Sequence, residues 1–295
     1  MRVAITGSNG YVGGLTCAEL KRRGHDVVRL LRWEAPVGEL HPGVLIGPGY
    51  KNTAQTAEAD VLLLLGGLFI PTHSCGDSKP LVAHNVAGPA ELCDAFLESR
   101  TLGVVHAGTS WQSVMPHGRP SNPYAASRQA AWTVIRAIAD AYGKSAISLR
   151  VADTFGPADP RSKLFGLLRM ATLQNNPLDM SPGQQIVDPA YAPDVAKAFV
   201  LACELAASES LSGEWSVAGG EPMKLVEKVR AFERAIGRPI PVNWGARAYR
   251  RGEPMEPVLL SRPNWWTGTV TFEEGVRLTE SEPGGLLASH DALSP

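Results

Sequence analysis

The chain opens on a short apolar stretch that leads directly into a cluster of glycines. Residues 2–6 (RVAIT) predict a buried strand. Gly7, Gly10 and Gly13 follow in TGSNGYVGG, and residues 11–24 then predict a helix. A strand, a glycine turn and a helix in this order constrain the fold more than any other feature, because they begin a β-α unit of a parallel sheet.

The same alternation continues through the first two-thirds of the chain. Further strands are predicted at 25–32, 44–46, 60–65, 102–108 and 145–151, and helices at 79–99 and 122–142. Gly88 and Pro89 indicate an interruption of the first of these helices. The pattern predicts an α/β fold, with a Rossmann-type, doubly wound parallel sheet covered by helices on both faces.

The glycine turn also suits a ligand. Its first glycine lets the chain turn sharply, the second lets the backbone approach a pyrophosphate, and the third lets the helix pack closely on the strand. The helix N-terminus adds partial positive charge. The turn therefore predicts a dinucleotide site, and its expected contacts are Gly7, Asn9, Gly10, Tyr11, Val12 and Gly13.

The end of the second strand indicates which dinucleotide fits. An acidic residue there would bind the ribose hydroxyls of NAD, whereas an arginine accommodates the 2′-phosphate of NADP. The strand ends at Arg32, and no acidic residue follows before Glu34. Arg32 is therefore predicted to bind the 2′-phosphate, and the expected cofactor is NADP(H), with NAD(H) as the alternative.

Composition and charge argue against several other partners. The 295 residues carry a net charge of −1, which provides no electrostatic footprint for nucleic acid or an anionic membrane. No run approaches the roughly 18 apolar residues of a membrane span, and no secretion signal is recognised, so a cytoplasmic location is expected. The four cysteines are scattered and the seven histidines show no ligand spacing, so no metal site is predicted.

A second group of residues suits proton transfer. Tyr124 and Arg128 lie four residues apart in a predicted helix, so their side chains share one face. The pKa of a tyrosine is ordinarily about 10, and a cation one turn away lowers it by favouring the phenolate. Thr109 follows the strand at 102–108 and is expected to hydrogen-bond the same oxygen. This arrangement would move a proton to or from a carbinol.

These motifs in this order resemble the extended short-chain dehydrogenases/reductases of the NAD-dependent epimerase/dehydratase superfamily. The resemblance runs from TGSNGYVGG through DVLLLLGG, Asn85, Thr109 and Tyr124 to Asp188 and Asp194. The stretches GTSWQ, LRVADTFGPADPRSKL, MSPGQQIVD and YRRGEPMEP are most similar to NDP-4-keto-6-deoxyhexose reductases of the CDP-abequose and CDP-paratose synthase-like group.

The resemblance implies a catalytic role for three residues. Tyr124 would donate a proton to the carbonyl oxygen of a keto-sugar as hydride arrives from the nicotinamide, and Thr109 would hydrogen-bond that oxygen. Arg128 stands where the family has a lysine, which binds the nicotinamide ribose and lowers the tyrosine pKa. Arginine is a permanent cation but cannot relay a proton. The further cofactor contacts implied by the resemblance are Leu65, Gly66, Asn85 and Arg128.

The residues after Thr109 narrow the reaction. The 4,6-dehydratases of the superfamily carry Asp-Glu there, to protonate a leaving hydroxyl and to abstract a proton. This chain has Ser110 and Trp111 instead. The sequence therefore argues against dehydration and favours reduction or epimerisation.

The expected substrate is a nucleoside-diphosphate sugar. Its pyrophosphate needs cations, and arginine binds phosphate in bidentate fashion. Asp153 follows the strand at 145–151, at the edge where ligands bind in such sheets. The predicted substrate-binding residues are Ser110, Trp111, Asp153, Arg161, Asp188, Arg250 and Arg251.

The composition changes after Gly156, where Pro- and Gly-rich connections separate short predicted helices at 163–173, 193–206 and 223–236. A smaller, mostly helical substrate-binding lobe is therefore predicted. The expected division is a dinucleotide-binding domain over 1–155, to which 186–218 and part of 256–280 return, a substrate-binding lobe over 156–185 and 219–255, and a mobile tail over 281–295.

The sequence thus predicts NADPH-dependent reduction of the 4-keto group of a nucleotide-linked 6-deoxyhexose. Two alternatives stay open. One is a nucleotide-sugar 4-epimerase with tightly bound NAD, and the other is a non-catalytic NADP(H)-binding protein, which Arg128 suggests. The resemblance also implies a homodimer through the helices at 79–99 and 122–142, because these helices pair in the family.

Overall fold

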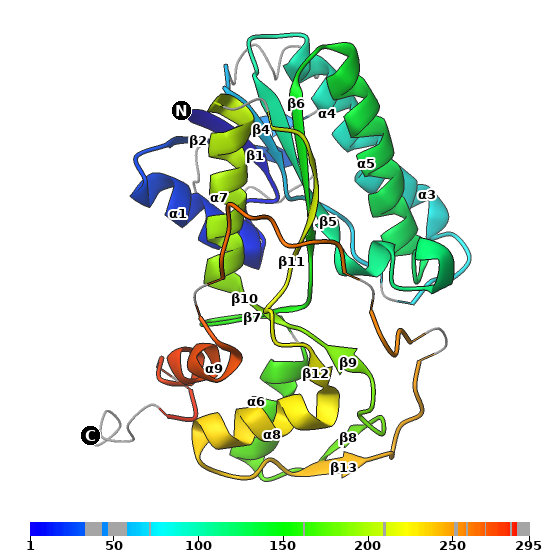
Figure 1. Cartoon of the computed structure of the whole chain (residues 1–295), viewed down its shortest axis with the longest axis vertical. Helices are drawn as coiled ribbons and strands as arrows, with labels where there is room; N and C mark the ends of the chain where they lie inside the picture. Colours follow the sequence, from blue (N-terminus) through cyan, green and yellow to red (C-terminus); the bar gives the residue numbers. More distant parts are fainter. Residues whose placement is uncertain are drawn as a thin grey trace.

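A parallel sheet of seven strands forms the centre of the larger domain (Figure 1). The computed structural model describes residues 1–32, 43–46, 58–70, 72–161, 163–208, 211–250, 253–257, 259–268, 270–283 and 285–287, with backbone alone for Arg32, 43–46 and Pro116. The strand order is β11-β6-β5-β4-β1-β2-β3. The strands are β1 (Arg2–Thr6), β2 (Asp26–Arg32), β3 (Gly43–Ile46), β4 (Val61–Leu64), β5 (Gly103–Thr109), β6 (Ser145–Val151) and β11 (Gly213–Val217).

β4 and the middle of β1 are apolar because both faces of the sheet are covered there. Val3 and Ile5 pack into one core, while Ala4 between them packs into the other. β4 repeats this alternation, with Leu63 on the first side and Leu62 on the second. Since successive strand side chains point to opposite faces, a strand buried on both sides reads as one apolar run.

Helices form a layer on each face (Figure 1). One layer holds α1 (Tyr11–Arg22) and α7 (Ala192–Ser208), and the other holds α4 (Gly88–Leu97) and α5 (Pro123–Ala141). The predicted interruption of the helix at 79–99 is present as a π-helical turn, η1 (Ala83–Ala87), between α3 (Ser78–Val82) and α4. This architecture confirms the predicted Rossmann-type, doubly wound sheet.

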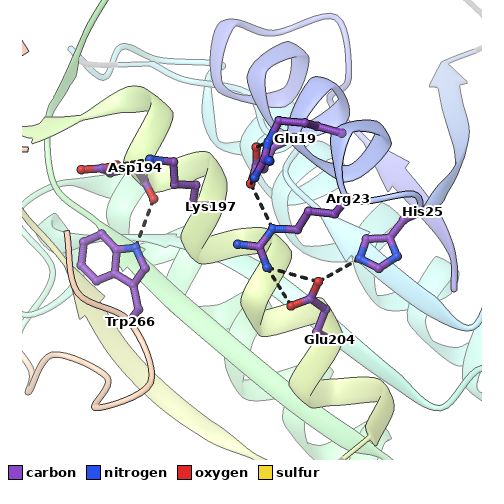
Figure 2. Close-up of polar contacts among 8 residues, drawn as sticks. Glu19, Arg23, His25, Asp194, Lys197, Glu204 and Trp266 are labelled. Atoms are coloured by element: carbon purple, nitrogen blue, oxygen red, sulfur yellow. Dashed lines mark hydrogen bonds and ion pairs between the residues drawn. The ribbon is translucent and has the colours of Figure 1, made fainter. Parts of the chain in front are cut away.

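Polar contacts join the two helices of the first layer (Figure 2). The Glu204 carboxylate of α7 accepts from the Arg23 guanidinium at 3.0 Å and lies 2.9 Å from His25 Nε2. Nearer the start of α7, the indole of Trp266 donates to the Asp194 carbonyl at 3.2 Å, and Lys197 pairs with the Asp194 carboxylate at 2.9 Å. The bond from Trp266 to Asp194 attaches the chain after β11 to the larger domain.

A smaller lobe lies beyond the carboxyl ends of the strands (Figure 1). Its helices are α6 (Leu164–Gln174), α8 (Leu225–Ile236) and α9 (Phe272–Glu280). Three two-stranded sheets pair β10 with β7, β12 with β9, and β13 with β8. These strands are β7 (Thr154–Phe155), β8 (Leu178–Met180), β9 (Ile186–Val187), β10 (Ala190–Tyr191), β12 (Met223–Lys224) and β13 (Val242–Trp244).

Part of the segment 281–295, which was predicted to be a mobile tail, packs against the small lobe. Leu286 is only 7% exposed and packs into the core of the small lobe. Its backbone N–H donates to the buried Glu280 carboxylate at 2.9 Å. The mobility of the segment stays a prediction, and residues 284 and 288–295 lie outside the described residues.

Helix α9 was not predicted, although the sequence carries a signal for it. Thr271 accepts from the backbone N–H of Glu274 at 3.3 Å, which is a helix N-cap. Phe272 and Val276, one turn apart, point into the lobe core.

No helix in the described ranges is long and apolar enough to cross a membrane.

Candidate active site

The glycine turn lies between β1 and α1, where the chain passes very close to itself. Gly7 has a φ of 72°, and its carbonyl accepts from the Gly10 N–H at 3.0 Å. A Cβ on Gly13 would lie 2.0 Å from the Gly7 oxygen, and one on Gly7 would lie 2.6 Å from the Gly66 nitrogen. The turn therefore has room for glycine alone at these two positions, which is the close backbone packing that a dinucleotide site needs.

The start of α1 is open toward this turn. Gly10 is the N-cap, no side chain caps the helix, and the first turn contains no acidic residue. The first N–H groups of a helix have no partner within the helix. They provide an anion site at this point, so the residues present fit the pyrophosphate of a dinucleotide.

A loop after β4 forms the other wall of the turn. The Gly66 N–H donates to Thr6 Oγ1 at 3.1 Å. The buried Asn85 amide accepts from the Leu68 N–H at 2.7 Å and donates to the Leu68 carbonyl and to Ser127 Oγ, each at 2.9 Å. Asn85 thus braces the loop at 65–68 against α5, and its direct contact with a cofactor stays a prediction.

Arg128 is bound to the sheet. The residue is 3% exposed, and its guanidinium donates to the Gly66 carbonyl at 2.9 Å and to the Ala107 carbonyl. Burial lowers the pKa of the guanidinium, and the nearby Tyr124 phenol opposes this shift. Arg128 therefore joins the carboxyl ends of β4 and β5, a role that the sequence did not predict, because the planar fork of arginine reaches two carbonyls at once.

Tyr124 stands at the start of α5, at the same edge of the sheet. Asn122 caps this helix by accepting from the Ala125 N–H at 2.8 Å, and Pro123 occupies its first turn. The Tyr124 ring meets Phe69 edge-on, with ring centroids 4.9 Å apart. Phe69 in turn lies 6.1 Å from the ring of Trp111.

Thr109 ends β5 and caps a single turn of 3-10 helix, η2 (Ser110–Gln112). Its hydroxyl accepts from the Trp111 N–H at 3.4 Å, and its own N–H donates to Gln112 Oε1 at 2.7 Å. A hydroxyl that accepts one bond still has its proton to donate. Thr109 is therefore able to donate to a substrate oxygen, and that role stays a prediction.

Phe69 was missed by sequence reasoning. It is 52% exposed, although it lies against Tyr124 and near Trp111. The sequence does place Phe69 just after a predicted strand, at the carboxyl edge of the sheet where ligands bind, and this position could have identified it as a site residue. Ser110, predicted to bind substrate, is buried within η2.

Two of the residues predicted to bind the substrate, Arg161 and Asp153, already have charged partners within the protein. The Arg161 guanidinium pairs with both carboxylate oxygens of Asp159, at 2.7 and 2.6 Å, and lies 4.7 Å from the Tyr11 ring centroid. Asp153 pairs with Lys163 at 3.3 Å. A pyrophosphate at Arg161 would have to compete with a carboxylate already bound there.

The other predicted residues are placed as follows. Asp188 accepts from the N–H groups of Gly220 and Glu221 at 3.0 and 2.9 Å, so it holds the turn that leads into β12. The charge of Arg250 opposes a rise in the Glu253 pKa, which burial of that carboxyl causes. Arg251 and the side chain of Arg32 lie outside the described part of the chain.

A groove extends from η2 toward the small lobe. Its walls come from residues 113–115, 117 and 118 and from residues 253–256 and 260. Apolar side chains line much of the groove, and Glu253, Glu256 and His117 are the charged or titratable residues in its lining. The groove supplies space for a bound molecule next to the Thr109 turn.

The carboxyl ends of parallel strands share one edge of a sheet, so the glycine turn, Thr109 and Tyr124 all lie at that edge. A Rossmann-type sheet with these groups defines the class of nicotinamide dinucleotide-dependent enzymes. The chain belongs to the NAD dependent epimerase/dehydratase family, whose model matches residues 3–218.

Individual relatives share the fold over most of the chain. UDP-glucose 4-epimerase of Bacillus subtilis (strain 168) is 21% identical over 84% of this chain and 86% of its own. 2-Alkyl-3-oxoalkanoate reductase of Stenotrophomonas maltophilia is 26% identical over 81% and 77%. The structure of Thermus thermophilus UDP-glucose 4-epimerase in complex with NAD is 24% identical, with a TM-score of 0.79 over 95% of this chain and 97% of that one.

These findings confirm the predicted superfamily and the predicted class of enzyme. The narrower resemblance to NDP-4-keto-6-deoxyhexose reductases stays a prediction.

Proposed function

We propose that the protein is a nucleotide-sugar 4-epimerase that retains NAD. The observation that carries this proposal is the placement of Thr109 and Tyr124 at the sheet edge that also holds the glycine turn. The similarity to UDP-glucose 4-epimerases supports this reaction over the reduction predicted from the sequence.

The cradle of the dinucleotide is made of backbone. The turn at Gly7, Gly10 and Gly13 and the uncapped amides of α1 would hold its pyrophosphate. A bound nicotinamide would supply reversible hydride transfer at the sugar carbon. The chain's own task is to hold the sugar oxygen and to move its proton.

Two hydroxyl groups carry out that task. The Tyr124 phenolate would accept the proton of the sugar C4 hydroxyl as the carbonyl forms, and the resulting phenol would donate it again as the hydroxyl is restored. The Thr109 hydroxyl donates to the same oxygen and holds it in place. Arg128 fixes the two strand ends between which this chemistry occurs, and neither binds the oxygen nor relays its proton.

The absence of carboxylates after Thr109 supports this reading over dehydration. Ser110 is buried in η2, and Trp111 faces Phe69. Neither side chain has an acid or base that would expel a C6 hydroxyl.

A second candidate is NADPH-dependent reduction of a nucleotide-linked 4-keto-6-deoxyhexose. It is favoured by the last residue of β2, because this residue is Arg32 and not the acidic residue that would bind the ribose of NAD. The similarity to 2-alkyl-3-oxoalkanoate reductase of Stenotrophomonas maltophilia also supports it. It uses Tyr124 and Thr109 in the same roles, but requires the reduced cofactor to be exchanged in every turnover.

The two candidates differ in what stays bound. Purified protein should be dialysed and denatured, and the released nucleotides identified by mass spectrometry. We expect about one NAD per chain, and conversion of UDP-glucose or dTDP-glucose to the 4-epimer without added cofactor. Loss of all cofactor on dialysis, with consumption of added NADPH by a 4-keto sugar nucleotide, would instead establish the reductase.

An absence of both activities in a protein that binds NADP(H) would establish the non-catalytic alternative. Tyr124→Phe is the control for both assays, because it removes the proton donor and leaves the ring that packs on Phe69.

We also propose a homodimer through α5 and the helical segment from α3 to α4, which together cover most of the predicted helices at 79–99 and 122–142. Val82, which precedes α4 by one turn of π-helix, is 54% exposed, and Val134 on α5 is 38% exposed. Apolar side chains at both helices fit a helix-pair interface. Sedimentation showing monomer alone would contradict it.

A further inference from the structure

A partly buried line of polar side chains runs from the Thr109 turn to the sheet. It starts at the Thr109 backbone, passes through Gln112 and Gln129, and ends at Arg150. We propose that Gln112, Gln129 and Arg150 are positioning residues that fix the Thr109 hydroxyl relative to Tyr124. The catalytic part of this inference rests on the proposed function.

The contacts are continuous. Gln112 Oε1 accepts from the Thr109 N–H at 2.7 Å, and Gln112 Nε2 donates to Gln129 Oε1 at 3.1 Å. The same Gln129 oxygen accepts from Arg150 Nη2 at 2.9 Å. Arg150 is itself held by Glu214 of β11, through bonds of 2.6 and 2.8 Å.

The direction of these bonds is set by their two ends. An arginine side chain can only donate, so Gln129 must present its oxygen to Arg150. Gln112 then meets that oxygen and must present its Nε2 group. Its own oxygen is left for the Thr109 N–H, which is also an obligate donor. One cation thereby orients two amides and a backbone group.

Gln112 and Arg150 are buried and Gln129 between them is partly exposed, so the two buried side chains need their hydrogen-bond partners. Gln112 has no exposed surface, and Arg150 is 7% exposed. Gly108, just before Thr109, has no room for a side chain, because a Cβ there would lie 2.5 Å from Gln112 Oε1. In a site of low dielectric constant each unpaired group is costly, so the members hold one another in place.

The line connects the two elements that carry the catalytic hydroxyls. Gln112 lies in η2, which Thr109 caps, while Gln129 lies in α5, which begins with Pro123 and Tyr124. Arg150 and Glu214 anchor the line in β6 and β11 of the sheet. A shift of one element would therefore change the separation between Thr109 and Tyr124.

Isosteric substitutions test this directionality. In Gln129→Glu the side chain still accepts from both Gln112 and Arg150. In Gln112→Glu two acceptor oxygens face each other, and Gln129 cannot turn its amide, because its nitrogen would then face Arg150. Gln129→Leu removes the line at its centre. Gln174→Glu, at the exposed end of α6 in the other lobe, is the matched control.

The first readout is steady-state epimerisation. Gln112→Glu and Gln129→Leu are expected to lower kcat by about 10- to 100-fold, with KM changed less than about threefold, because misplaced groups affect the reacting geometry more than binding. Gln129→Glu is expected to keep kcat within about threefold of wild type. Equal losses in Gln129→Glu and Gln112→Glu, or no loss in Gln112→Glu and Gln129→Leu, would overturn the proposal.

The second readout does not need activity. Amide hydrogen exchange of the peptide at 108–113 should be faster in Gln112→Glu and Gln129→Leu, and unchanged in Gln129→Glu and Gln174→Glu. If this order holds but no variant or wild-type protein turns over a sugar nucleotide, the proposed function fails and the positioning of η2 by the line stands. If all four variants exchange at the wild-type rate, the positioning inference fails.

Discussion

The glycine turn and the Thr109–Tyr124 corner lie at one edge of the same sheet, yet they are built differently. The turn is shaped by backbone, because a side chain on Gly7 or Gly13 would collide with neighbouring backbone atoms. The corner is shaped by side-chain contacts between distant parts of the chain, made by Asn85, Arg128 and Gln112. Local sequence therefore determines the first region, and long-range contacts determine the second.

The largest expected effect is at the glycine turn. Gly13→Ala would place a Cβ 2.0 Å from the Gly7 oxygen, so the backbone must move. We expect a loss of about 3 kcal/mol or more in the free energy of unfolding, and loss of dinucleotide binding, measured by denaturation and calorimetric titration.

The neighbouring residue is the control for this prediction. A Cβ on Gly14 would lie 3.9 Å from the Ser8 oxygen, and Gly14 is within α1. Gly14→Ala should raise stability by up to about 1 kcal/mol, because alanine favours a helix over glycine. If both variants bind the dinucleotide normally, the turn is not the cofactor site.

The next effect concerns Arg128. Arg128→Met would leave the buried carbonyls of Gly66 and Ala107 without this donor. We expect the free energy of unfolding to fall by about 1–3 kcal/mol, in the absence of any ligand. Unchanged stability with altered catalysis would show that the arginine acts on the reaction and not on the strand ends.

The sequence predicted these two regions to different degrees. Gly7, Gly10 and Gly13 could be assigned because a turn of this kind depends on the residues within it. Arg128 was correctly placed on one face of α5 with Tyr124. Its binding to Gly66 and Ala107 could not be read from the sequence, since it depends on how far α5 stands from β4 and β5.

The third prediction concerns the pH dependence of the free energy of unfolding, through a buried histidine of β5, the strand that ends at the Thr109–Tyr124 corner. His106 of β5 is fully buried, with Nδ1 3.2 Å from Ser148 Oγ, and burial, with Arg128 next, lowers its pKa well below 6.5. A depressed pKa means that the unfolded chain takes up a proton first. Stability is therefore full above about pH 6.5 and falls as the pH drops toward the lower folded value.

Between pH 7.5 and 5.5 we expect His106 to remove about 1 kcal/mol from the free energy of unfolding. Denaturant titration of His106→Gln should show a shallower pH slope than wild type. His84→Gln, at an exposed position, is the control and should keep the wild-type slope. Equal slopes in all three proteins would contradict the buried neutral state of His106.

The smallest effect tests a side chain that attaches the turn to the small lobe. The Tyr11 hydroxyl donates to the Pro157 carbonyl at 2.9 Å. Tyr11→Phe should lower the free energy of unfolding by about 0.5–1 kcal/mol and leave dinucleotide affinity within about twofold. A large loss of affinity would show that the turn depends on this side chain as well as on backbone.

The small lobe shows where sequence reasoning reached its limit. Helices α6 and α8 were predicted within a few residues, because their apolar residues recur with the helical period. Strands such as β9 and β12 are two residues long, too short for any period, and form only because Val187 meets Met223 across the lobe. The partners of Arg161 and Asp188 likewise depend on turns that no local sequence pattern predicts.

The central claim is that hydride transfer occurs where Tyr124 and Thr109 meet the cofactor. The most direct measurement is rapid mixing of NAD-loaded protein with UDP-glucose or dTDP-glucose, with detection of reduced nicotinamide. The account predicts transient reduction in wild-type protein and a rate at least about 100-fold lower in Tyr124→Phe, with unchanged NAD affinity. Reduction at the wild-type rate in Tyr124→Phe, or no reduction in the NAD-loaded wild-type protein, would contradict it.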